Sequence, residues 1–264
     1  MNEATPPIEA APAEDNSTQT KSLRHRIISH PLTHLLAALV ILGLIQGFVV
    51  KLFVVPSGSM EQTFEVGDRI LVNRLPQTLS GSQHTPGNGD IVVFSTEQAL
   101  WPSNRPTPDT GFAAQMKYWV KFVAGDLIGI GPTTDHMLLK RVIGTPGQTV
   151  ECCSPSGKLK IDGVEIDEPY IFEDLPFQSG ALDCSTTPVS SRCFAPVTVP
   201  PGMLLVLGDH RSASSDGIAN CRGLDPGDPA TKNCARWVRI GDIIGSPFVR
   251  VWPLNRIGGI GGIG

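Results

Sequence analysis

Residues 35–50 read LLAALVILGLIQGFVV, a run in which Gln46 is the one polar side chain and no residue is charged. With its flanks, from residue 32 to residue 55, the apolar segment reaches roughly the 20 residues that cross the hydrocarbon core of a bilayer. We therefore predict a transmembrane helix over residues 31–55. Lys51, near its far end, is expected to extend its ammonium group to the lipid headgroups.

The charges before this segment predict its orientation. Lys21, Arg24 and Arg26 precede it, so the positive-inside rule places the N-terminus in the cytoplasm and everything after residue 55 outside the plasma membrane. The alternative is a cleaved signal peptide, but the apolar run is long for one and no small-residue cleavage site clearly follows. Residues 1–20 are rich in Ala, Pro, Thr and acidic residues, and we expect residues 1–30 to form a disordered cytoplasmic tail.

The rest of the chain has the composition of a β domain. Among 264 residues, 28 are Gly and 23 are Pro, and only 17% are charged, which is typical of short strands joined by turns. Strand-like runs occur at 68–73, 90–94, 137–143, 149–151, 158–163, 203–207, 242–245 and 248–252. We predict a mainly β fold, with an antiparallel, partly closed β-sheet domain over residues 56–256 and a Gly-rich tail over 257–264. The net charge of −4, with no basic stripe, argues against a nucleic-acid partner.

One stretch has helical periodicity. Between residues 112 and 127 the apolar side chains fall at helical spacing, and Lys117 and Lys121 lie off that face. We expect a helix packed on the sheet. The alternative is an interfacial helix with Tyr118 and Trp119 at headgroup level.

All six cysteines lie in the part predicted to be outside, where disulfides persist. No C-x-x-C pair is present, so no zinc or other metal site is expected. Cys184 with Cys193 and Cys221 with Cys234 are natural loop closures. The adjacent Cys152 and Cys153 are then left over, because a vicinal bridge is strained. The competing pattern links one of this pair to Cys184 or Cys193.

The hydroxyl-rich turn Pro56-Ser57-Gly58-Ser59-Met60 follows the apolar segment directly, a position that suits a nucleophile acting at the bilayer surface. Serine needs a base to accept its proton, and among the histidines only His210, within Gly-Asp-His-Arg, has an informative context. Lys140 is the other candidate, because burial among apolar neighbours would lower its pKa toward neutrality. Taken alone, Lys140 reads as a strand lysine that faces solvent.

Five motifs, in order, change that interpretation: PSGSM at 56–60, GDRILV at 67–72, GDIVVF at 89–94, KRVIGTPG at 140–147 and GDHRSASSD at 208–216. Together they resemble the bacterial type I signal peptidases, membrane-bound serine proteases with a Ser–Lys dyad. The resemblance covers the chain from the anchor to about Trp252. It implies an enzyme that cleaves signal peptides after Ala-x-Ala from exported preproteins as they leave the secretion translocon, next to membrane lipid and without a metal or cofactor.

The resemblance also implies roles by position. Ser59 is the expected nucleophile and Lys140 the expected general base. The Ser59 backbone N–H and the Ser57 hydroxyl would form the oxyanion hole, and the Ser214 hydroxyl would orient the lysine amine. The expected structural ion pairs involve Arg141, Asp209, Arg211 and Asp216. The expected substrate pockets are lined by Phe53, Val55, Met60, Phe64, Ile70, Val93, Leu138 and Leu139.

The chain departs from the family pattern at several positions. Gln62 stands where the family often has proline, and His210 and Ser212 replace the usual Asn and Asp. The arginine expected two residues after Asp216 is missing, so that ion pair is absent or is made by Arg222. The segment from Cys221 to Cys234 resembles an insertion.

Two other functions remain as alternatives. Self-cleaving repressors share the Ser–Lys fold but are soluble and carry a DNA-binding domain, which the anchor and the acidic leader argue against. A non-catalytic, signal-peptidase-like factor for surface-protein assembly should lack the serine or the lysine, and this chain has both.

Overall fold

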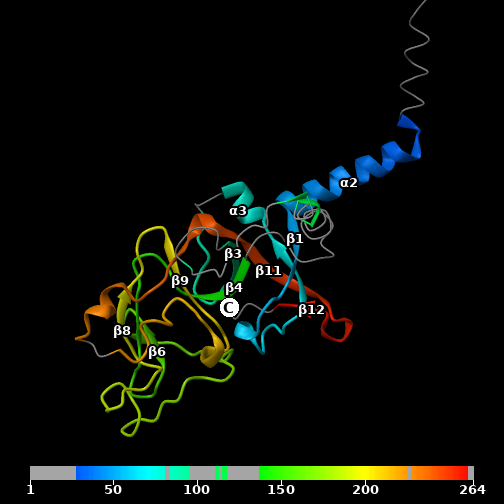
Figure 1. Cartoon of the computed structure of the whole chain (residues 1–264). Helices are drawn as coiled ribbons and strands as arrows, with labels where there is room; N and C mark the ends of the chain where they lie inside the picture. The colour runs from blue at the N-terminus through cyan, green and yellow to red at the C-terminus, as the bar shows by residue number, and fades with distance from the viewer. Residues whose placement is uncertain are drawn as a thin grey trace, which may run out of the picture. The chain divides into compact units, whose positions relative to one another are not determined.

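The structure is a computed structural model, and it describes residues 28–80, 84–95, 101, 111–112, 115–117, 137–224 and 227–260. The chain divides into two compact units, residues 1–43 and 44–264. The second unit contains the β-sheets (Figure 1). It also contains each residue expected at the functional site.

The apolar segment forms helix α2, Pro31–Phe48, whose 18 residues are long and apolar enough to cross a membrane. The predicted boundary at residue 55 is wrong, because Val50–Val54 form strand β1. Alternation along β1 buries Lys51 and Phe53, which expose 8% and 4% of their surface. Lys51 is therefore a buried residue of the sheet and does not extend to the headgroups. A run that is apolar throughout hides this change of period from helix to strand.

The larger sheet has eight strands in the described residues, with the order β1-β2-β11-β3-β4-β9-β10 and with β12 paired to β11. All of its strand pairs are antiparallel. Figure 1 shows β3, β4 and β11 together in this sheet. After β1, its strands are β2 Arg69–Asn73, β3 Ile91–Ser95, β4 Met137–Gly144, β9 Met203–Leu207, β10 Val238–Arg239, β11 Ile243–Trp252 and β12 Gly258–Gly259.

Strand β11 holds the larger sheet together by changing partners along its length. Its residues Ile243 and Gly245 pair with β3, and its residues from Ser246 to Trp252 pair with β2. The register shifts within each of these two pairings. Gly245 lies at the change, where a Cβ atom would approach the Asn73 carbonyl oxygen to 2.1 Å. The mainly antiparallel β prediction is confirmed, but the described strands run from β1 to β10 without closing. The predicted Gly-rich tail is wrong in part, because Gly258 and Gly259 pair with β11.

A smaller sheet of four described strands has the order β7-β6-β5-β8. Its strands are β5 Thr149–Cys152, β6 Leu159–Ile161, β7 Val164–Glu165 and β8 Phe194–Thr198. The hairpin predicted at 149–163 is confirmed as β5 and β6. One buried cluster joins the two sheets, with Ile143 and Leu205 from the larger and Val150 and Phe194 from the smaller.

Short helical turns connect the strands in the described part of the chain. They are η1 Gly58–Met60, α3 Leu75–Ser80, η4 Arg211–Ala213, η5 Pro229–Asn233, η6 Ile240–Asp242 and η7 Leu254–Arg256. The helix predicted over residues 112–127 lies mostly outside the described residues, and so do both interpretations of it.

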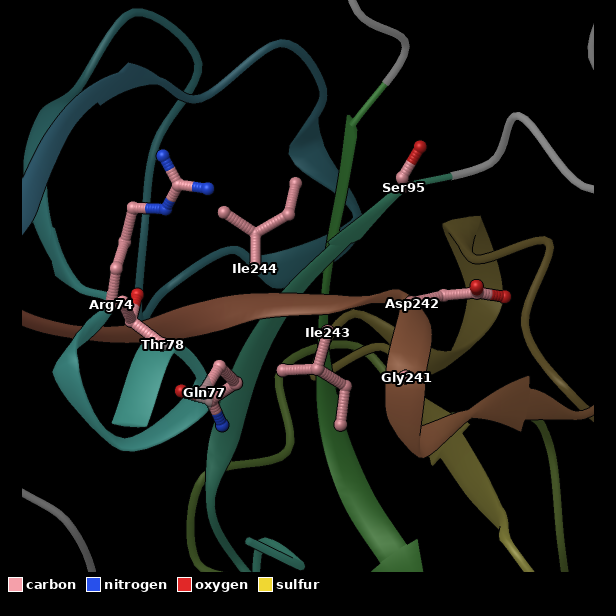
Figure 2. Close-up of a pocket in the computed structure, with 8 residues that line it drawn as sticks. All are labelled: Arg74, Gln77, Thr78, Ser95, Gly241, Asp242, Ile243 and Ile244. Carbon is pink, nitrogen blue, oxygen red and sulfur yellow. The ribbon is translucent and has the colours of Figure 1, made fainter. Parts of the chain in front are cut away.

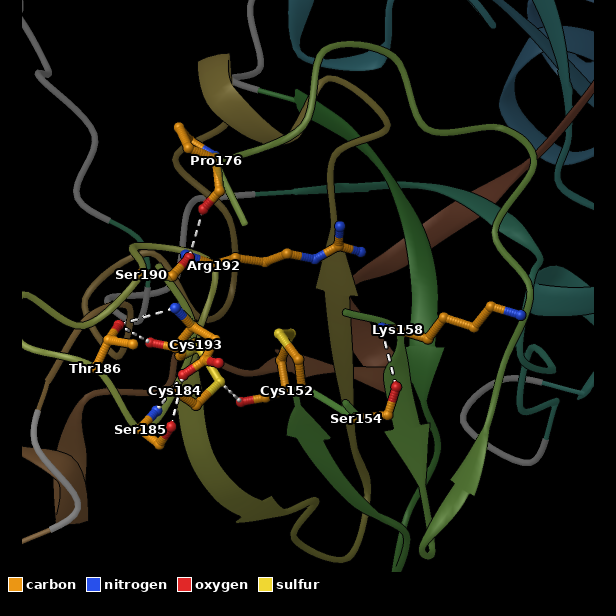
Figure 3. Close-up of a disulfide and its surroundings, with 12 residues drawn as sticks. Cys152, Ser154, Lys158, Pro176, Cys184, Ser185, Thr186, Ser190, Arg192 and Cys193 are labelled. Atoms are coloured by element: carbon orange, nitrogen blue, oxygen red, sulfur yellow. Dashed lines mark hydrogen bonds between the residues drawn. A yellow bond between two sulfur atoms is a disulfide. The ribbon is translucent and has the colours of Figure 1, made fainter. Parts of the chain in front are cut away.

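The cysteines form three disulfides: Cys184–Cys193, Cys221–Cys234 and the vicinal pair Cys152–Cys153. The two loop closures are confirmed, whereas the prediction that the adjacent cysteines stay unpaired with each other is wrong. Figure 3 shows Cys184 and Cys193 next to Cys152. The sulfur atoms of Cys153, Cys184 and Cys193 lie within 4.8 Å of one another, but each of them is already engaged in a disulfide.

Candidate active site

The turn that carries Ser59 is held at both ends by buried side chains. Val55 and Met60 each expose 1% of their surface in one apolar cluster. The Phe64 backbone N–H donates to the Met60 carbonyl oxygen at 2.7 Å, and the His210 N–H donates to the Ser59 carbonyl oxygen at 3.2 Å. These contacts fix the position of Ser59, which is itself buried.

Lys140 reaches Ser59 from the middle of β4. Its Nζ donates a hydrogen bond to Ser59 Oγ, and Lys140 exposes only 3% of its surface. Strand alternation puts Lys140 on the same face as Leu138 and Val142. It lies opposite Val92 of β3, so the amine emerges from an apolar surface.

The surroundings of Lys140 lower the pKa of its side-chain amine. Burial disfavours the charged ammonium and lowers the pKa of Lys140 from 10.5 to about 8. The carboxylates of Asp216 and Asp209 act in the opposite direction and limit the fall. A substantial neutral fraction is therefore present in mildly alkaline solution, and a neutral amine can accept a proton from a hydroxyl group.

A cavity of about 370 Å³ opens onto Ser59 and Lys140. Sequence reasoning missed Glu61, Trp101 and Arg236 in its wall. Trp101 and Arg236 lie outside every motif, and no sequence signal marks them. The described residues that line it are Ser57, Gly58, Ser59, Glu61, Trp101, Leu138, Lys140, His210, Ala213, Ser215 and Arg236.

The two other serines expected at the site lie in different surroundings. Ser57 is exposed, and its Oγ lies 3.4 Å from Ser59 Oγ. The Ser214 Oγ is buried and has no hydrogen-bond partner among the described residues. It lies against Gly208, where a Cβ atom would come within 2.3 Å of it. The expected hydrogen bond from Ser214 to the lysine amine is therefore not formed in this structure.

Arg141, the neighbour of Lys140, is locked to Asp209 by a buried two-point ion pair. Its Nε and Nη2 donate to the Asp209 carboxylate at 2.8 and 2.6 Å, and neither residue exposes more than 2% of its surface. The Thr63 hydroxyl donates to the same carboxylate at 2.6 Å. The guanidinium also lies 3.9 Å from the centre of the Tyr170 ring. This network joins β4, the segment after Ser59 and the segment after β9.

The remaining charged candidates pair with partners that the motifs do not name. Arg211 binds Glu168, with Nη2 and Oε1 2.5 Å apart. Arg222 binds Asp216 at 3.0 Å, which is the second of the two alternatives considered for that ion pair. All four charged candidates are therefore engaged in ion pairs.

Most of the residues expected to line the substrate pockets do not line this cavity, and their contact with substrate stays a prediction. Leu138 alone among them lines the cavity. The other seven each expose 4% or less and belong to one apolar cluster, because both faces of the neighbouring strands are covered. These seven are Phe53, Val55, Met60, Phe64, Ile70, Val93 and Leu139.

A second cavity, of about 420 Å³, is lined by residues that no motif marks. Figure 2 shows Arg74, Gln77 and Thr78 on one side of it and Gly241 and Asp242 on the other. Neither Ser59 nor Lys140 lines it, so the candidate active site is the smaller cavity.

Comparison with known proteins agrees with this geometry. The family profile described as signal peptidase, peptidase S26, matches residues 28–220. A probable signal peptidase I of Mycobacterium leprae is 34% identical over 82% of this chain and 73% of its own length. A signal peptidase I of Mycobacterium tuberculosis is 32% identical over 96% of this chain and 84% of its own. One from Leptolyngbya laminosa is 30% identical over 82% and 76%. With a match over most of its length, this chain belongs to the signal peptidase family of peptidase S26.

Proposed function

We propose that this protein is a membrane-anchored serine endopeptidase that removes N-terminal signal peptides from exported preproteins. The single observation that carries the proposal is the buried hydrogen bond between Lys140 Nζ and Ser59 Oγ. A hydroxyl group paired with a desolvated amine of lowered pKa is an activated nucleophile with its base in place.

The chemistry uses the residues of the smaller cavity. Neutral Lys140 accepts the Ser59 proton as Oγ attacks the scissile carbonyl carbon. The Ser59 backbone N–H and the Ser57 hydroxyl donate to the oxyanion that forms. Lys140 then gives its proton to the leaving amine, and the acyl group stays on Ser59. A water molecule that Lys140 deprotonates hydrolyses this ester and frees the enzyme.

The substrate class follows from the family and from the anchor. The relatives carry the name signal peptidase I, and α2 is long and apolar enough to cross a membrane. We expect cleavage after Ala-x-Ala sites, with Leu138 in contact with a small side chain next to the scissile bond. We also place the N-terminus in the cytoplasm and the β domain outside the plasma membrane, where preproteins leave the translocon.

A reconstituted cleavage reaction tests the proposal. The detergent-solubilised full chain is incubated with a labelled preprotein that has an Ala-x-Ala site, and the new N-terminus is identified by mass spectrometry. We expect cleavage at that site and none when phenylalanine replaces the alanine before the scissile bond. Ser59→Ala enzyme is the matched control. A folded wild-type chain that leaves the preprotein intact would favour the alternative, a non-catalytic assembly factor.

A further inference from the structure

His210 lies between two carboxylates at the edge of the catalytic cavity. Its Nδ1 is 3.0 Å from Glu61 Oε2, and its Nε2 is 3.3 Å from Glu173 Oε2. The ring meets the Phe172 ring edge to face, with the centroids 5.0 Å apart. Its side chain is only 12% exposed, so these partners define its position.

The contact with Glu61 is the shorter of the two that the ring nitrogens of His210 make. A carboxylate only accepts hydrogen bonds, so a ring that carries a proton on Nδ1 donates it to Glu61. Lys140 and Arg236 line the same cavity as His210.

Glu61 places its carboxylate directly on the nucleophile turn. A Cβ atom built on Gly58 would lie 2.5 Å from Glu61 Oε1, so the carboxylate occupies the space that a side chain at Gly58 would fill. Gly58 separates Ser57 from Ser59, the two residues whose donors form the proposed oxyanion hole. A carboxylate that moved from this place onto those donors would oppose the negative charge that develops during attack.

We propose that His210 is a positioning residue that holds the Glu61 carboxylate against Gly58 and so keeps it off the donors of the oxyanion hole. The inference rests on the proposed Ser59 mechanism. His210 acts on the turn twice, through its ring on Glu61 and through its backbone N–H on the Ser59 carbonyl oxygen. Without the ring, Glu61 keeps its charge beside the reacting carbonyl and loses the partner that fixes it.

The test asks whether removing the charge of Glu61 restores activity to a His210 variant. Three forms of the full chain are compared in single-turnover and steady-state cleavage of the labelled preprotein: His210→Ala, His210→Ala with Glu61→Gln, and His210→Ala with Glu165→Gln. We expect His210→Ala to lower kcat about three- to tenfold with little change in KM, because a partly screened charge acts mainly on the transition state. Glu61→Gln should restore most of that loss. Glu165, an exposed glutamate on β7, is the matched control, and Glu165→Gln should restore none.

A role in folding alone would give a different pattern. His210→Ala would then lower the melting temperature and the amount of active enzyme, and Glu61→Gln would not restore kcat. If His210→Ala does not fold, the same comparison is made with His210→Phe, which fills the site without a hydrogen-bond donor. An unchanged kcat in His210→Ala, or a double variant as slow as the single one, overturns the inference. Wild-type enzyme that is active while Ser59→Ala is not shows that the proposed function stands independently of this result.

Discussion

Lys140 Nζ and Ser59 Oγ, 81 residues apart in the sequence, share a buried hydrogen bond. Each residue comes from a different kind of element: Ser59 from a short turn and Lys140 from a strand. Because neither can reach the other unless the turn packs on the sheet, the pair forms only in the folded chain. Substitution of either residue tests the catalytic role of the pair.

Removing either member of the pair should abolish cleavage. A nucleophile and its base act as a unit, so Ser59→Ala and Lys140→Ala should each lose nearly all of kcat. Far-UV circular dichroism should show that both variants keep the β fold. The measurement is the rate of preprotein cleavage, and substantial activity in either variant would contradict the assignment of the dyad.

The pH dependence of cleavage should identify the base. Only neutral Lys140 can accept the Ser59 proton, and its pKa is lowered to about 8. The kcat/KM should therefore rise with pH, with a midpoint near 8, and stay high in the alkaline range. A histidine base would put the midpoint near the ordinary histidine value of about 6.5. His210→Ala should keep the same midpoint as wild type, and a folded but inactive His210→Ala variant would contradict a lysine base.

Lys140 should also lower the stability of the fold at neutral pH. Its folded-state pKa is about 8 against 10.5 in the unfolded chain, so the folded state loses its proton first. The free energy of unfolding should rise as pH increases from about 8 to 10.5, and the full destabilisation should persist below pH 8. Lys140→Met should therefore be more stable at pH 7, by about 1 to 2 kcal/mol after loss of the Ser59 hydrogen bond.

Thermal unfolding of the solubilised chain at pH 7 and pH 10 checks this expectation. The stabilisation by Lys140→Met should shrink at the higher pH, because the unfolded lysine is then partly neutral too. Lys158, an exposed lysine that pairs with Asp167 at 2.6 Å, supplies the control, since Lys158→Met should not stabilise the chain. Equal or lower stability of Lys140→Met at pH 7 would show that burial of the amine is not a destabilising feature.

The two accessory serines should differ in importance. Ser57 Oγ lies near Ser59 Oγ, and loss of one oxyanion donor lowers turnover by roughly 10²- to 10³-fold, so Ser57→Ala should mainly reduce kcat. Ser214 Oγ has no hydrogen-bond partner in the described part of the chain, so Ser214→Ala should have a smaller effect, within about tenfold. Steady-state kinetics of both variants measures this, and a larger loss for Ser214→Ala would mean that its hydroxyl reaches Lys140 during the reaction.

The orientation in the membrane can be tested with added cysteines. All six native cysteines are in disulfides, so an added thiol is a selective reporter. Val66→Cys, at a site 60% exposed in the β domain, should react with a membrane-impermeant maleimide in intact cells. Thr18→Cys should react only after the cells are permeabilised. The opposite result would put the β domain in the cytoplasm.

Several parts of this protein can be predicted from local patterns in the amino-acid sequence. Uniform apolarity marks α2, and short runs between Gly and Pro mark β2, β3, β4, β5, β6 and β9. The resemblance to the signal peptidases indicated Ser59 and Lys140, because five motifs occur in the order typical of that family. Spacing favoured the two loop-closing disulfides, Cys184–Cys193 and Cys221–Cys234, but left a competing pairing with Cys152 or Cys153 open.

Packing between elements determines which side of each element is covered and which distant residues meet. Sheet register buries Lys51 and moves the end of the helix to Phe48. It also turns Phe53 and Ile70 into the core, away from the cavity. His210 meets Glu61 across 149 residues of sequence. Periodicity reports a side chain's direction relative to its own element. The identity of its neighbours depends on packing among elements, which a single segment does not encode.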